Sequence, residues 1–253
     1  MSELLLLAAL IVVGHACQSL LGFGGAFIPV ALGALWFPIG ELKLIVIVLN
    51  VPTAAWMALR DVRAVDVKRL AWPIAPWLAL GLIVGLVGVH RVDAVIAKRV
   101  LGAFVASIAL VGLVHAWRLS GGDDLKGAAP SWRMRACLLL GGAMQGGYAA
   151  GIPLTALGLL STPWDRRTRL ASIGALCLVV YVSLTIIHIV DGALSLPTWR
   201  TCALLLPAVG AGVLVGELLR ERIPERPFRL AVWALLVCAG LALALAARGV
   251  DSP

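Results

Sequence analysis

Two stretches, LGFGGAFIP at residues 21–29 and QGGYAAGIP at residues 145–153, place glycine and proline inside long apolar tracts. A helix broken in hydrocarbon exposes backbone N–H and C=O groups, so a break survives only where other groups satisfy them. The chain's one asparagine, Asn50, and its two glutamines, Gln18 and Gln145, also fall inside apolar tracts. Together these features predict a central polar site within a membrane protein.

The composition excludes a soluble globular domain. Hydrophobic residues make up 61% of the chain and charged residues 13%, with a mean hydropathy of +1.01, which is typical of an integral membrane protein. The net charge of +8 lies in short patches between apolar segments. That pattern favours anchoring at the cytoplasmic face of a membrane over nucleic-acid binding, so we expect a lipid bilayer and no nucleic acid as partners.

The apolar tracts have the lengths of transmembrane helices. A helix that crosses a hydrocarbon core of about 30 Å needs about 20 apolar residues. Residues 4–21 meet that length, whereas the arm after the first break, residues 24–37, is too short. Three further predicted spans follow at residues 42–59, 70–89 and 100–117.

The pattern starts again after a polar stretch at residues 118–135. Two short arms, 136–148 and 150–162, meet at the second glycine-rich stretch, and the predicted spans after them are 170–190, 201–219 and 230–247. We therefore predict an all-α polytopic membrane protein with two inverted repeats, each a broken, re-entrant helical hairpin followed by three transmembrane helices. The sequences of the two halves align when Pro29 is matched with Pro153. The predicted boundaries within a single membrane domain at 1–253 are repeat 1 at 1–119, a cytoplasmic linker at 120–131 and repeat 2 at 132–253.

The distribution of lysine and arginine favours this re-entrant version over eight simple spans. With residues 60–69 in the cytoplasm and each hairpin turning back, fifteen basic residues lie on the cytoplasmic side and six on the other. If each broken segment crossed once, the count would be ten against eleven. The positive-inside rule therefore predicts inverted repeats in a bacterial-type inner membrane, with both termini outside.

The two breaks suit the binding of an anion. The first turn of a helix offers unpaired backbone N–H groups and the positive end of the helix dipole, and helices that begin near Gly24 and Ala149 would face each other around a negatively charged substrate. Glycine lets the backbone approach a ligand closely, but it also suits tight helix packing. A buried amide must bind a ligand, line water or tie down broken backbone. The predicted substrate-binding residues are Gln18, Gly22, Phe23, Gly24, Gly25, Asn50, Gln145, Gly146, Gly147, Tyr148 and Thr155.

Ionisable side chains are scarce in the middle of the spans. All thirteen acidic residues lie at or near segment ends, which leaves no candidate for a buried carboxylate relay. His15 and His188 are the candidates for coupling, because imidazole titrates near physiological pH. A structural role for His15 and an interfacial position for His188 are the alternatives. We expect no deep lysine or arginine as a counter-ion, so anion binding would rest on helix ends and amides.

Motifs for catalysis or for holding a metal or cofactor are missing from the sequence. The chain has no HExxH, GxSxG or P-loop sequence, and its five cysteines form no CxxC pair, so the usual catalytic and metal-binding signatures do not apply. We therefore expect no enzymatic activity, no metal and no cofactor.

The string LLGFGGAFIPVALGAL at residues 20–35, early in a chain with two four-element halves, resembles the TauE/SafE family of sulfite-exporter-like membrane proteins. The residues that match the first glycine-rich motif of that family are Gly22, Gly24, Gly25 and Pro29. The second half carries GGYAAGIP at residues 146–153, where the family often has three or four consecutive glycines. The resemblance implies a permease for a small sulfur anion such as sulfite, sulfoacetate or a related sulfonate.

From these observations we expect a secondary transporter, an exporter or permease whose small anionic substrate binds between the two breaks at the membrane midplane. The alternative is a membrane sensor or scaffold in which the broken hairpins serve only to pack subunits. The sequence leaves the exact substrate, the direction of transport, the coupling ion and the oligomeric state open.

Overall fold

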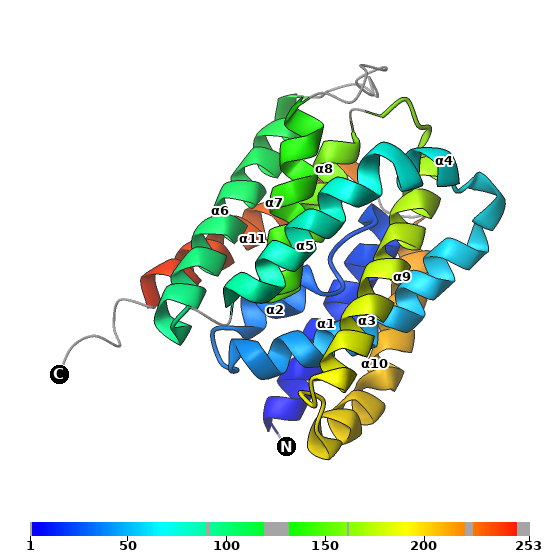
Figure 1. The fold of residues 1–253 in the computed structure, drawn as a ribbon. Coiled ribbons are helices and arrows are strands. Elements are labelled where there is room, and N and C mark those ends of the chain that lie inside the picture. The colour runs from blue at the N-terminus through cyan, green and yellow to red at the C-terminus, as the bar shows by residue number, and fades with distance from the viewer. Residues whose placement is uncertain (1, 90–91, 119–131, 161, 221–224, 247–253) are drawn as a thin grey trace.

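The computed structural model describes residues 2–89, 92–118, 132–160, 162–220 and 225–246. These residues form a bundle of helices without strands (Figure 1), which confirms the predicted all-α class. The predicted linker at 120–131 lies outside the described residues. The elements are α1 (Ser2–Leu21), α2 (Phe27–Gly33), α3 (Ile39–Arg60), the 3₁₀ turn η1 (Val62–Ala64), α4 (Val67–Arg69), the π turn η2 (Leu70–Ile74), α5 (Ala75–Val89), α6 (Ala94–Arg118), α7 (Trp132–Tyr148), α8 (Ile152–Leu159), α9 (Arg166–Val190), α10 (Leu196–Arg220) and α11 (Glu225–Ala246).

Six helical segments among the described residues are long and apolar enough to cross a membrane. A shorter apolar helix, Leu230–Leu245, lies within α11. These lengths confirm a multi-pass membrane protein. The six segments are Glu3–Leu21, Ile39–Arg60, Val67–Val89, Val95–Val114, Arg167–Val190 and Leu196–Leu219.

Both predicted helix breaks are present, and the second follows directly after the predicted arm at 136–148. In the first, Gly22 and Gly24 have φ of 84° and 130°, a conformation that glycine adopts without a steric penalty. In the second, Gly146 and Tyr148 belong to the last turn of α7, and the positive φ of 55° falls on Ala149. The second break therefore comprises residues 149–151, and the predicted site residues Gly146, Gly147 and Tyr148 lie in the helix before it.

Gly146 packs against another helix instead of forming the break. A Cβ atom built on Gly146 would lie 2.3 Å from the carbonyl oxygen of Leu82 in α5, so this glycine serves the close approach of two helices rather than a bend in one. The predicted alternative role of glycine, tight helix packing, applies at this position.

After each break, the chain passes close to the start of the helix that precedes the break. A pocket is lined by Glu3 and Leu4 at the start of α1 and by Trp36 and Glu41, so by α3 the chain is back at the end of the bundle where α1 begins. In the second hairpin, a Cβ atom on Gly158 of α8 would lie 2.8 Å from Cβ of Cys137, near the start of α7.

The two breaks share two backbone hydrogen bonds. In each, the residue with positive φ donates its backbone N–H to the carbonyl oxygen of a glutamine four residues earlier, at 2.8 Å in the first break and 2.9 Å in the second. A second backbone hydrogen bond begins the helix after each break. It runs from Ile28 N–H to the Gly24 carbonyl oxygen at 2.9 Å, and from Thr155 N–H to the Gly151 carbonyl oxygen at 3.1 Å. This register differs from the alignment of Pro29 with Pro153 by three residues. The equivalent pairs, each 127 residues apart, are Gln18 and Gln145, Gly22 and Ala149, Gly24 and Gly151, and Ile28 and Thr155.

The hairpins pack against helices from the other half of the chain. Helix α1 lies along α10, and α7 lies along α5 (Figure 1). The remaining long helices pair as α3 with α9 and α6 with α11. The two halves are therefore interlocked rather than placed side by side.

Glycine makes the α5–α7 contact possible. A Cβ atom on Gly85 would lie 1.9 Å from the carbonyl oxygen of Ala143, and one on Gly142 would lie 2.3 Å from that of Leu78. Such distances leave no room for a side chain, so backbone packs directly on backbone, as small residues allow in membrane helices.

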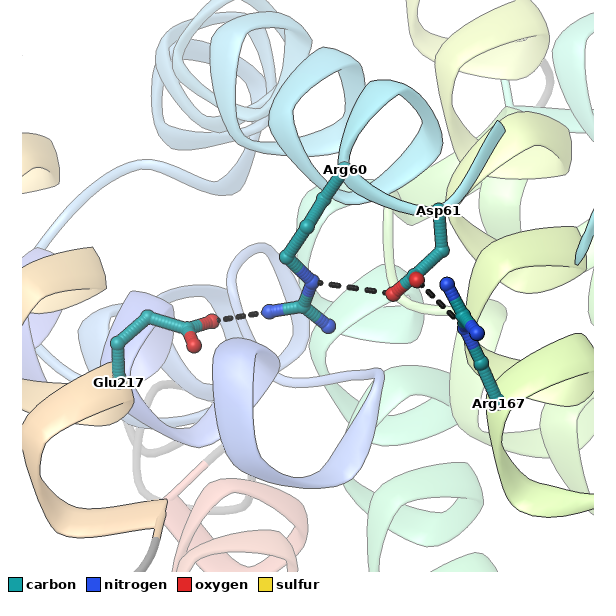
Figure 2. A network of polar contacts seen from close by, with 4 residues as sticks. All are labelled: Arg60, Asp61, Arg167 and Glu217. Atoms are coloured by element: carbon teal, nitrogen blue, oxygen red, sulfur yellow. Dashed lines mark hydrogen bonds and ion pairs between the residues drawn. The ribbon is translucent and has the colours of Figure 1, made fainter. Parts of the chain in front are cut away.

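A polar network ties α3, α9 and α10 together at one end of the bundle (Figure 2). Arg60 at the end of α3 forms an ion pair with Glu217 of α10 and another with Asp61 at 3.3 Å. Arg167 of α9 donates from Nε to Asp61 Oδ1 at 2.7 Å. Arg167, together with Arg60, holds the pKa of the Asp61 carboxyl below its usual range.

The loop after α3 adds further links to this end. Trp164 donates its indole N–H to Asp66 Oδ2 at 2.9 Å, and the Asp66 backbone N–H donates to Ser172 Oγ at 3.1 Å. Trp164 and Ser172 are both buried. The segment between α3 and α5 is thus fastened to the start of α9.

Gly85→Ala should destabilise the protein by about 1–3 kcal/mol, because the added methyl group forces α5 away from the α7 backbone. Gly88→Ala in the same helix is the matched control, since nothing lies within 4 Å of a Cβ atom there. Thermal unfolding in detergent measures both variants. Equal stability of Gly85→Ala and Gly88→Ala would contradict the close helix contact.

Asp61→Asn should destabilise the protein at pH 7 by about 1 kcal/mol, since it weakens a partly exposed charge-assisted hydrogen bond. Folding lowers the pKa of Asp61. The stabilisation is therefore present above the pKa of Asp61 in the unfolded state, about 4, and is lost as the pH falls through its lower pKa in the folded state. The difference in unfolding temperature from wild type should therefore shrink below about pH 4. Asp191→Asn, at an exposed position, is the control; a pH-independent difference for Asp61→Asn speaks against the network.

Candidate functional site

Every residue predicted for the substrate or for coupling is buried in the structure. Gln145, Asn50 and His15 have no measurable exposure. The described residues thus place unusually polar groups in the interior of an apolar bundle, where a polar atom needs a partner. The buried set is His15, Gln18, Gly22, Phe23, Gly24, Gly25, Asn50, Gln145, Gly146, Gly147, Tyr148, Thr155 and His188.

The first break brings Gln18, Gly25 and Asn50 together. A Cβ atom on Gly25 would lie 1.7 Å from Gln18 Oε1 and 2.4 Å from Asn50 Oδ1. Both oxygens are fully buried and lack a hydrogen-bond partner. The absence of a side chain at Gly25 is therefore what gives these two amides their space, and we call the three residues the first cluster.

The orientation of Asn50 is fixed by its own helix. Asn50 Nδ2 donates to the carbonyl oxygen of Val46 at 2.7 Å, so Oδ1 is the atom that faces Gly25. Thr53, one turn further along α3, also has a buried Oγ1 without a partner. The first cluster therefore presents mainly acceptor atoms, which suit a hydrogen-bond donor or a cation.

The second break brings Gln145, Gly151 and Thr155 together, and we call these residues the second cluster. The backbone N–H of Gly151 donates to Gln145 Oε1 at 3.0 Å, and Thr155 Oγ1 donates to the carbonyl oxygen of Gly151 at 3.3 Å. A Cβ atom on Gly151 would lie 1.6 Å from the carbonyl oxygen of Gly141. Gln145 thus ties down the broken backbone, one of the three predicted roles for a buried amide.

The bond to Gly151 occupies Oε1 of Gln145 and leaves Nε2 on the side of the Tyr181 phenol. Gln145 Nε2 is buried without a hydrogen-bond partner, although the Tyr181 phenol of α9 lies close to this amide. The second cluster therefore presents a donor, which suits an oxygen atom of an anion. Two equivalent glutamines thus show opposite ends to their surroundings, an acceptor at Gln18 and a donor at Gln145.

Other predicted residues lie near the breaks but face elsewhere. Phe23 stacks on Trp233 of α11, with ring centroids 5.0 Å apart. Gly147, like Gly146, faces α5: a Cβ atom built on Gly147 would lie 3.5 Å from the carbonyl oxygen of Gly85. Among the described residues, no hydrogen bond joins the first cluster directly to the second.

Both candidate coupling histidines are buried within helices. His15 Nδ1 bonds the carbonyl oxygen of Ile11 at 2.9 Å, and its Nε2 is buried without a partner. His188, expected at the interface, is 5% exposed at the end of α9, and its carbonyl oxygen accepts the N–H groups of Ala193 and Leu194. A role in coupling stays a prediction for both. The described residues bring no three histidine, cysteine or acidic side chains together as metal ligands.

The structure adds Gly151, Tyr181 and Lys43 to the residues of interest. Gly151 is found by matching the two glutamines rather than the two prolines. Lys43, near the start of α3, is only 7% exposed. Its spacing of seven residues from Asn50, which places both on one helix face, is the signal in the sequence that points to it.

Comparison with protein families gives a match along almost the whole chain. A model described as "Sulfite exporter TauE/SafE" matches residues 6–243, which include both breaks. Neither curated proteins nor solved structures give a match.

Gln145→Met should cost about 1–3 kcal/mol of stability, because it leaves the buried Gly151 N–H without an acceptor. Gln18→Met is the matched control, since Gln18 Oε1 has no partner to lose, and we expect a change of under about 1 kcal/mol in either direction. Chemical denaturation in detergent measures both. Equal losses for the two variants would disprove the difference between the clusters.

Proposed function

Because the chain belongs to the TauE/SafE sulfite exporter family, whose members are membrane transporters for sulfur anions, we propose that it is a secondary transporter for a small sulfur oxyanion or organosulfonate. Sulfite and sulfoacetate are the substrates to test first. The substrate binds between the two helix breaks near the membrane midplane, and the protein alternates access to it from the two sides.

The observation that carries this proposal is the repetition of one local geometry 127 residues apart. Gln18 and Gln145 accept the same backbone bond from a residue with positive φ. Two such breaks in one apolar bundle support an inverted repeat with a re-entrant hairpin in each half. The interlocked packing of α1 with α10 and of α7 with α5 fits a pseudo-two-fold axis between the halves.

The second cluster supplies groups that an anion requires. Gln145 Nε2 is a free buried donor, and the start of α8 adds backbone N–H groups at the positive end of a helix dipole. The first cluster, with its acceptor atoms, suits a protonated oxygen of the substrate or a co-transported cation. This division of roles makes the site polar without a carboxylate in its centre.

Alternating access requires one end of the bundle to open. We assign the end with the Arg60, Asp61, Arg167 and Glu217 network to the cytoplasm (Figure 2), in line with the positive-inside rule. The network fastens α3 of the first half to α9 and α10 of the second. Its opening would expose the site to the cytoplasm, and both termini then lie outside.

Gly25→Ala should reduce sulfite flux into proteoliposomes at least about tenfold while the protein stays folded, because the methyl group displaces the amides of Gln18 and Asn50. Gly40→Ala is the control, since nothing lies within 4 Å of a Cβ atom there. Size-exclusion chromatography and thermal unfolding establish that both variants fold. Full sulfite flux through Gly25→Ala would remove the first cluster from the transport site.

A further inference from the structure

Lys43 is the unexplained charge in the interior of the bundle. The residue is 7% exposed, and within the described residues it forms no hydrogen bond or ion pair. Other basic residues near helix ends, such as Lys68 and Arg69, are exposed. A buried ammonium without a partner is costly, so its presence calls for a ligand or a second state that neutralises it.

The face of α3 that carries Lys43 lies at the contact between the two halves. Lys43, Asn50 and Met57 are each seven residues apart and share one face of the helix. Met57 packs against α9, because a Cβ atom on Gly174 would lie 2.8 Å from Met57 Cβ. Lys43 therefore lies on the same inner face as Asn50, about 10 Å along the axis from it.

The register of 127 residues places Lys43 at the second break. Its equivalent in the second half is Leu170 of α9, whose Cδ2 lies 2.8 Å from a Cβ atom built on Gly22, the positive-φ residue of the first break. The same register pairs Lys43 with Ala149, the positive-φ residue of the second break. The contact between α3 and α7 agrees with this position.

We infer that Lys43 is the counter-ion of the transported anion and holds it at the second break together with Gln145 Nε2. The leucine at the equivalent position, Leu170, places an apolar side chain against the first break instead. This inference rests on the proposed function, and it corrects the expectation that anion binding relies on amides and helix ends alone. A lysine without a carboxylate partner is neutralised by an oxyanion when the substrate enters.

The nearest acidic groups do not take this role. Glu3 and Glu41 line a pocket together with Leu42 and Ile45, and Glu41 is two positions from Lys43, which places it on a different face of α3. Both glutamates lie at the end of the bundle where α1 and α3 begin, and among the described residues neither forms an ion pair with Lys43. The charge of Lys43 is therefore available to a ligand at the break.

The test is the binding of sodium sulfite to purified full-length protein, measured by thermal shift and by titration calorimetry against sodium chloride of equal ionic strength. Lys43→Met should fold and be at least as stable as wild type without sulfite, because it removes an unpaired buried charge. Its sulfite Kd should be roughly ten- to a hundredfold higher than that of wild type, as expected for one charge-assisted hydrogen bond. Lys98→Met, in the first turns of α6, removes a charge of the same kind and should bind like wild type.

Each other outcome has a distinct meaning. Wild-type affinity in Lys43→Met, or a Lys43→Met variant that does not fold, overturns the assignment of Lys43 as the counter-ion, the second because the lysine is then structural. An equal loss of affinity in Lys98→Met also overturns it, since a general effect of surface charge would explain both. If wild type binds neither sulfite nor sulfoacetate, the proposed function itself fails.

Discussion

A helix that breaks inside hydrocarbon must find partners for its freed backbone groups within the protein, and this constraint shapes both halves of the chain. In each half, the carbonyl of a glutamine accepts the first backbone N–H after the helix ends. In the second half, the glutamine side chain also takes the Gly151 N–H. In the second half, the side-chain amide that ties down the backbone is thus also one of the groups that make the interior polar.

The two breaks share two backbone hydrogen bonds but differ in the chemistry of their side chains. Gln145 uses its oxygen on the backbone and keeps a donor free, whereas Gln18 and Asn50 keep acceptors free around Gly25. The difference extends to the facing helices, where Leu170 meets one break and Lys43 is assigned to the other. An interlocked pair of similar halves with unequal side chains can recognise a charged substrate that itself has no two-fold symmetry.

Much of this arrangement was predictable from the sequence, because a membrane restricts the choices. Span lengths and the two glycine-rich stretches predicted the helices and both breaks, and the scarcity of amides pointed to Gln18, Asn50 and Gln145. The predicted register between the halves was three residues off, since Pro29 and Pro153 are poor markers of register: proline is tolerated at several positions of a first helical turn. The burial of Lys43 was missed because span length does not reveal which face of a helix turns inward.

The central claim is that a sulfur oxyanion binds at the second break, between the halves. The most direct test is an electron cryo-microscopy map of the protein with selenite, a heavier analogue of sulfite. The account predicts a strong density feature within hydrogen-bond distance, about 3 Å, of Gln145 Nε2. Density for the anion at a different location, or an unbroken helix through residues 149–151, would contradict it.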